Sequence, residues 1–139
     1  MSVPKSEIYN CDCMEYMKGI DNKHFDLAIV DPPYGLKKSS ITGKGKLINR
    51  KLNTAKMDWD IAPKQEYFDE LFRISKNQII WGGNYFVLPP TRGIICWDKE
   101  QAFENFSAFE YAWTSFYKPS KIIRINSQRN NPDKIKDPS

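Results

Sequence analysis

Histidine and cysteine are scarce in this sequence, which contains one histidine, His24, and three cysteines, Cys11, Cys13 and Cys96. An odd number of cysteines without framework spacing argues against a secreted domain held together by disulfides. A Cys-x-Cys pair, one distant cysteine and a lone histidine do not match the ligand spacing of a zinc site. The sequence therefore predicts reduced thiols and no bound metal.

Long hydrophobic runs are also missing. No apolar stretch approaches the roughly 20 residues that a membrane-spanning helix needs. The first seven residues, Met-Ser-Val-Pro-Lys-Ser-Glu, contain no apolar core of a signal peptide. We therefore expect a cytoplasmic protein without a membrane partner.

Neither sign of charge dominates, because 21 lysines and arginines stand against 17 acidic residues, for a formal net charge of +4. Such a mild positive balance is compatible with nucleic-acid binding but does not require it. A hydrophobic content of 40% and an aromatic content of 14% indicate a folded chain and not a disordered one. A length of 139 residues predicts a single domain.

The clearest pattern that is present spans residues 25–34, which read Phe-Asp-Leu-Ala-Ile-Val-Asp-Pro-Pro-Tyr. The apolar run at 27–30 predicts a strand that is covered on both faces of a parallel sheet. Pro32 has no amide donor and cannot continue a central strand, so we expect the strand to end at Asp31. Ligands of open α/β sheets bind outside the carboxyl ends of the strands, which makes Asp31 a candidate site residue.

The chemistry of this turn suits a planar ring that carries an amine. Asp31 offers a carboxylate, and the carbonyls of Asp31 and Pro32 are acceptors that no strand pairing consumes. Tyr34 offers a flat ring for stacking. Acceptors on the hydrogens of an exocyclic amine would stabilise the positive charge that develops as its nitrogen attacks. The alternative is a turn that only ends a strand and packs a tyrosine.

Asp-Pro-Pro-Tyr at the end of an apolar strand resembles the catalytic motif of DNA amino-methyltransferases. These enzymes transfer a methyl group from S-adenosylmethionine (AdoMet) to the exocyclic amine of adenine or cytosine. A motif near the amino terminus is similar to the permuted subgroup, in which the cofactor half follows the catalytic half. The resemblance covers roughly residues 7–125 and includes the segments 9–14, 80–86, 96–99 and 110–116.

The resemblance implies a Rossmann-like methyltransferase fold, a mostly parallel sheet with flanking helices. It implies AdoMet as cofactor and double-stranded DNA as substrate, with the target base flipped out of the duplex. Adenine is favoured over cytosine, because cytosine enzymes commonly carry serine where Asp31 stands. The implied catalytic residues are Asp31, Pro32, Pro33 and Tyr34. The implied cofactor contacts are Asp12, Cys13 and Asp31, although Asp12 is equally suited to cap a helix.

A basic segment follows the motif at residues 35–62, and its weak apolar periodicity predicts a mobile loop. A loop of this length is usually functional or disordered. Its cations could contact DNA phosphates, or could simply be solvated. The candidate DNA-binding residues are Lys37, Lys38, Lys44, Lys46, Arg50 and Lys51.

The remaining patterns predict alternating strands and helices, which favour a parallel α/β sheet. We expect a short strand at Ile8 and Tyr9, a two-turn helix after Asp12 that ends near Gly19, and a helix at 63–75. Further strands are expected at 78–81, 93–97, 108–116 and 121–125. Residues 1–125 would form the catalytic half of a methyltransferase domain, and the polar residues 126–139 a disordered or truncated tail.

The glycine-rich turn F-x-G-x-G, which this family uses to approach AdoMet, does not occur in the sequence. In the permuted order it would lie beyond Ser139. The expected half-sheet would leave a strand edge unpaired, and this favours a homodimer or another association through that edge. Two alternatives stay open. One is a non-catalytic fragment that binds DNA or a partner chain, and the other is methylation of RNA or of a protein amide.

Overall fold

The computed structural model describes residues 3–36, 60–101, 104 and 106–127. Its elements in chain order are α1 (Cys13–Lys18), β1 (Phe25–Val30), α2 (Gln65–Ile74), β2 (Ser75–Trp81), the 3-10 helix η3 (Gly83–Tyr85), β3 (Ile94–Asp98), β4 (Phe109–Thr114) and β5 (Lys121–Arg124). The chain is an α/β protein, as its sequence predicted. The six candidate DNA-binding residues, at positions 37, 38, 44, 46, 50 and 51, lie outside the described residues, as does the predicted tail beyond Ser127.

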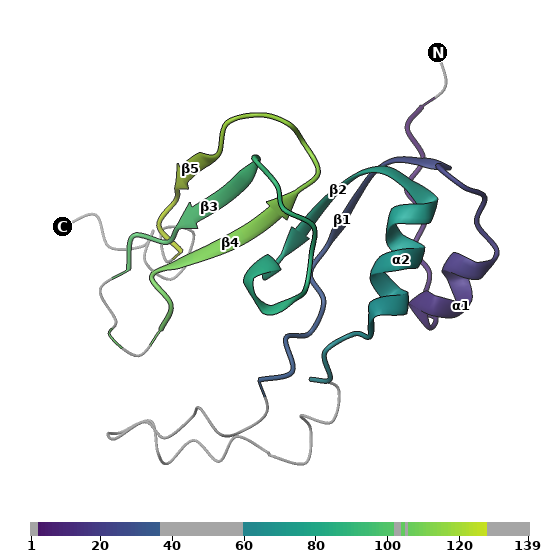
Figure 1. Cartoon of the computed structure of the whole chain (residues 1–139), viewed down its shortest axis with the longest axis horizontal. Helices are drawn as coiled ribbons and strands as arrows, with labels where there is room; N and C mark the ends of the chain where they lie inside the picture. The colour runs from purple at the N-terminus through teal and green to yellow at the C-terminus, as the bar shows by residue number, and fades with distance from the viewer. Residues whose placement is uncertain (1–2, 37–59, 102–103, 105, 128–139) are drawn as a thin grey trace.

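The five strands form one mixed sheet in the order β1-β2-β4-β3-β5 (Figure 1). β1 is parallel to β2, β3 is parallel to β5, and β4 is antiparallel to both β2 and β3. Four of the five strands therefore run in the same direction, which agrees with the prediction of a mostly parallel sheet, and β4 runs against them. The physical reason is that no helix is described between β3 and β4, so the chain can return as an antiparallel neighbour.

β1 lies at an edge of the sheet and is not covered on both faces, which corrects the prediction for this strand. Ala28 and Val30 pack against the core, whereas Leu27 is 42% exposed and Ile29 is 62% exposed. The helices α1 and α2 lie together on one side of β1 and β2 (Figure 1), with α2 against the sheet and α1 against α2. Among the described strands, β2 is the one that pairs with β1.

The core forms where α2 packs on the sheet. Phe68, Leu71 and Ile74 recur at helical spacing and are buried on one face of α2. Phe68 and Leu71 meet Ile80 of β2 and Trp113 of β4, and these four residues are the buried cluster at the centre of the domain. The predicted helix at 63–75 is thus present, and its buried apolar face forms part of the core.

Helix α1 begins and ends as the sequence predicted. The Asp12 carboxylate accepts hydrogen bonds from the amides of Met14 at 2.8 Å and Glu15 at 3.2 Å, and Gly19 ends the helix. Arg73 of α2 then ties the two helices together, because its guanidinium donates to the Met17 carbonyl at 2.7 Å. These bonds fix α1 next to the last turn of α2.

The predicted strand at Ile8 and Tyr9 is absent, which corrects the interpretation of the amino-terminal segment. Residues 3–10 have no regular structure, and Ile8 is 96% exposed. A strand is defined by pairing with a neighbour, and no described segment pairs with residues 3–10. The other predicted helices and strands are present, with ends that differ by a few residues.

Candidate functional site

The Asp-Pro-Pro-Tyr motif directly follows β1 and borders a cavity of about 440 Å³. The lining residues are Cys13, Val30, Asp31, Pro32, Pro33, Ile61, Pro63 and Tyr67. Asp31, Pro32 and Pro33 therefore line the same cavity as Cys13, which comes from the start of α1. Asp12 does not line this cavity, because its carboxylate is directed at the α1 amides.

Asp31 and Tyr34 are joined by a hydrogen bond, in which the Tyr34 hydroxyl donates to Asp31 Oδ1 at 2.9 Å. Among the described residues, no group hydrogen-bonds to the second carboxylate oxygen, Oδ2. Burial raises the pKa of Tyr34 far above its ordinary value, and the hydrogen bond and negative charge of Asp31 add to this shift. Tyr34 is therefore a neutral phenol that can donate to Asp31 at every physiological pH.

The Tyr34 ring packs against the turn that follows β2. It stacks on Tyr85 with ring centroids 4.5 Å apart and planes 19° apart, and it contacts Phe86 at 6.2 Å. Gly82 sits directly against the ring in a left-handed conformation with φ +69°, and a Cβ there would lie 2.1 Å from Tyr34 Cε1. Only glycine fits both the conformation and the space.

The turn at Gly82, Gly83 and Asn84, within the segment 80–86 that carried part of the resemblance, therefore borders the motif. Tyr85 was not predicted as a site residue. The signal that could have found it is an aromatic residue directly after a glycine-containing turn at the carboxyl end of a strand.

The two ends of the predicted basic loop also lie next to each other, beyond the carboxyl end of β1. The Gly35 amide donates to Asp60 Oδ1 at 2.9 Å, and Asp60 is buried. Gly35 has φ +71°, and a Cβ there would lie 3.0 Å from Ala62 Cβ. The chain between residues 36 and 60 thus departs from and returns to a point next to Tyr34.

The segments 96–99 and 110–116, which also carried the resemblance, are neighbours in the sheet. β3 pairs with β4 so that Trp97 faces Glu110, and Lys99 forms an ion pair with the Glu110 carboxylate at 2.5 Å. The negative charge of Glu110 also contributes to the raised pKa of Tyr34. The structure therefore brings these segments to the same end of the sheet as the motif, the end at which β1 and β3 have their carboxyl ends.

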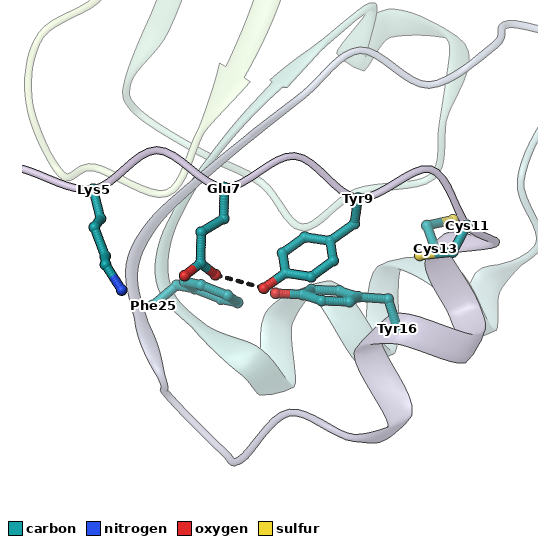
Figure 2. A pocket seen from close by; sticks show the side chains of 7 residues that line it. All are labelled: Lys5, Glu7, Tyr9, Cys11, Cys13, Tyr16 and Phe25. Carbon is teal, nitrogen blue, oxygen red and sulfur yellow. Dashed lines mark hydrogen bonds between the residues drawn. The ribbon is translucent and has the colours of Figure 1, made fainter.

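Cys13 faces Tyr67 across the cavity. Burial raises the pKa of Tyr67 to about 12, and the nearby Cys13 thiol contributes to this shift. Cys13 also lines a second cavity of about 480 Å³ between the amino-terminal segment and α1 (Figure 2). Cys13 therefore lines both cavities.

Aromatic and charged side chains line this second cavity. Figure 2 shows the Tyr9 and Tyr16 rings side by side, and their centroids are 5.0 Å apart. The Tyr9 hydroxyl donates to the Glu7 carboxylate. The remaining lining residues are Lys5, Cys11, Cys13 and Phe25. Lys5, Glu7, Tyr9 and Cys11 alternate along the chain, as one side of an extended segment does.

No family model and no curated protein matches the sequence. Within the described ranges, no group of three or more histidine, cysteine or acidic side chains is placed to hold a metal ion. In the same part of the chain, no helix is long and apolar enough to cross a membrane.

Proposed function

We propose that this chain is the catalytic part of a DNA amino-methyltransferase that methylates the exocyclic amine of adenine with AdoMet. The observation that carries the proposal is the grouping at the end of β1. There Asp31 and the two consecutive prolines line one cavity together with Cys13, and the Tyr34 hydroxyl donates a hydrogen bond to the Asp31 carboxylate. This grouping supplies hydrogen-bond acceptors and an aromatic face within a few ångströms of each other.

The chemistry of the proposal follows from the nature of an aryl amine. Its lone pair is delocalised into the ring, so the nitrogen is a weak nucleophile until acceptors engage its hydrogens. Asp31 Oδ1 is held by Tyr34, which leaves Oδ2 to accept one hydrogen of the amine. The Pro32 carbonyl is the acceptor for the other hydrogen. Both acceptors stabilise the positive charge that develops on the nitrogen during attack.

The proposed substrate is a base that has left the duplex, because a paired and stacked amine cannot reach Asp31. Tyr34 would stack on the flipped ring, since stacking on an aromatic side chain is the usual replacement for lost base stacking. The basic residues 37–51 would contact phosphates. Their segment begins and ends beside the motif, at Gly35 and Asp60, which is where the flanking DNA would lie.

AdoMet would supply the methyl group. The two cavities, both lined by Cys13, present carboxylates from Asp31 and Glu7 and the rings of Tyr9 and Tyr16. These groups fit a cofactor that consists of a planar base, a sugar with hydroxyls and a cationic sulfonium. In this proposal Cys13 and Asp31 hold the end of the cofactor that faces the amine. Asp12 does not touch the cofactor; it caps α1 and thereby positions Cys13.

The test uses the full chain, AdoMet labelled in its methyl group and unmethylated genomic DNA, followed by hydrolysis to nucleosides. We expect the label to appear in N6-methyl-2′-deoxyadenosine. The Asp31→Ala variant should not incorporate this label. Asp26→Asn is the matched control, because Asp26 lies on the same strand and pairs with Lys76 away from the motif. Undiminished methylation by Asp31→Ala would refute the assignment, and label in cytosine would correct the target base.

A second candidate function is favoured by the edge position of β1. Among the described strands, β1, which Asp31 directly follows, has a neighbour on one side only. Its side chains Leu27 and Ile29 are exposed, and the sequence lacks F-x-G-x-G. Such a chain would serve as a module that pairs with a second copy or with a partner through β1. Calorimetry with AdoMet separates the two candidates, since a module without enzymatic function would take up no cofactor in the presence of DNA.

A further inference from the structure

Tyr85 presents an aromatic face that the proposed reaction does not yet use. It belongs to η3, directly after β2, and its ring lies nearly parallel to that of Tyr34, at 19° and 4.5 Å. Tyr85 is 46% exposed, so one part of its ring faces solvent. Among the described residues, no hydrogen bond to its hydroxyl holds the ring in this position.

The two rings differ in how firmly they are held. Tyr34 is fixed by its bond to Asp31 and by the close approach of Gly82. The backbone of η3 is also fixed, because the Tyr85 amide donates to the Gly82 carbonyl at 2.9 Å and Phe86 packs on Phe68 at 5.1 Å. The Tyr85 side chain is therefore the part of this stack that can move by rotation about χ1.

We infer that Tyr85 is the second wall of an aromatic clamp, in which a flipped purine enters between the Tyr34 and Tyr85 rings. The inference rests on the proposed function and adds a positioning residue to it. Insertion of a planar ring requires the centroids to separate from 4.5 Å to about 7 Å, near the upper limit for interacting rings. Rotation of one half-exposed side chain supplies this change without moving the backbone.

The clamp explains why the two rings are already nearly parallel. A base that entered would exchange one tyrosine–tyrosine stack for two base–tyrosine stacks. A purine offers each wall more ring surface than a pyrimidine, so Tyr85 would favour adenine over cytosine independently of Asp31. The hydroxyl of Tyr85 has no part in this role, and phenylalanine should replace it.

The test measures binding of the full chain to a duplex that carries 2-aminopurine, a fluorescent purine, opposite an abasic position. We expect Tyr85→Leu to weaken binding roughly 5- to 150-fold, the range for loss of one base–aromatic stack. Tyr85→Phe should bind within about twofold of the unmodified chain, by the same stacking argument. Tyr117→Leu is the matched control, because Tyr117 is 83% exposed and stacks under Arg92 instead. Tyr85→Met is a second variant of similar volume should the leucine variant not fold.

Two results separate failure of the clamp from failure of the proposed function. If Tyr34→Leu weakens binding while Tyr85→Leu binds equally well or more tightly, Tyr85 is a bystander or a competitor of the base, and the clamp is overturned. If the unmodified chain does not bind, or if Tyr34→Leu and Asp31→Ala also leave binding unchanged, the proposed function fails and the clamp fails with it. Retained binding in Tyr85→Phe would show that the ring is required and the hydroxyl is not. If the hydroxyl had a structural role instead, Tyr85→Phe would lose binding as Tyr85→Leu does.

Discussion

Gly82→Ala should be the most damaging single methyl group that can be added near the motif. The new Cβ would lie 2.1 Å from Cε1 and 2.7 Å from Cζ of Tyr34, and the residue would keep φ +69°. A left-handed conformation costs a non-glycine residue about 1–2 kcal/mol. The Tyr34 ring must also move, which removes its stack on Tyr85 and its bond to Asp31, each worth about 0.5–1.5 kcal/mol. We expect a loss of about 2–5 kcal/mol in the free energy of unfolding.

Urea unfolding followed by circular dichroism measures this loss, provided that the slope with denaturant stays constant. Gly19→Ala is the matched control, because it ends α1 at φ −85° and a Cβ there would meet only the Tyr16 carbonyl, at 3.8 Å. We expect that variant to lie within about 1 kcal/mol of the unmodified chain. A loss below about 0.5 kcal/mol for Gly82→Ala, the scatter of ordinary surface changes, would refute the contact with Tyr34.

A double-mutant cycle separates the backbone cost from the clash. In a Tyr34→Ala background the ring is gone, so Gly82→Ala should cost only the conformational part, about 1–2 kcal/mol. The coupling between positions 34 and 82 should therefore be about 1–3 kcal/mol. Additive effects of the two substitutions would show that Gly82 is required by its backbone conformation alone.

Three further outcomes follow from the described contacts. Asp12→Ala removes the α1 cap and should lower the free energy of unfolding by about 0.5–2 kcal/mol, whereas Asp12→Asn should retain most of it; urea unfolding distinguishes them. Because burial raises the pKa of Tyr67 in the folded state to about 12, its contribution to stability is complete below the unfolded pKa near 10 and is lost as pH rises toward 12. Tyr67→Phe should flatten that decline and Tyr117→Phe should not, as measured by unfolding at stepped pH. Ile29→Lys places a charge on the exposed side of β1 and should reduce self-association in sedimentation velocity, while Lys76→Gln on β2 should not.

The helices and strands could be predicted because their patterns are local. The α2 stripe repeats at helical spacing, and Asp12 and Gly19 are ordinary residues for the two ends of a helix. The grouping of Asp31 and Tyr34 was also within reach, since two consecutive prolines leave the chain few ways to continue. These features depend on residues that are close together in the sequence, so they can be predicted from the sequence alone.

The errors concern neighbours in space. Leu27 and Ile29 look like buried strand residues, but their burial depends on what lies beside β1, and no local pattern reports that. The direction of β4 depends on how the chain returns after β3. Tyr85 enters the site only because the left-handed Gly82 turns the chain across the Tyr34 ring. Each of these features is a property of tertiary packing.

Under the proposed function, the edge position of β1 would link association to ligand binding. Any strand that paired with the open edge of β1 would border Asp31, because the motif directly follows that strand. Its side chains would also lie beside Leu27 and Ile29, which are otherwise exposed. If pairing at this edge tightens the site for its ligand, the ligand must tighten the pairing by the same factor. We therefore expect DNA carrying an accessible adenine to increase association, and Ile29→Lys to weaken both association and DNA binding; weakening of association alone would show that the edge and the site are independent.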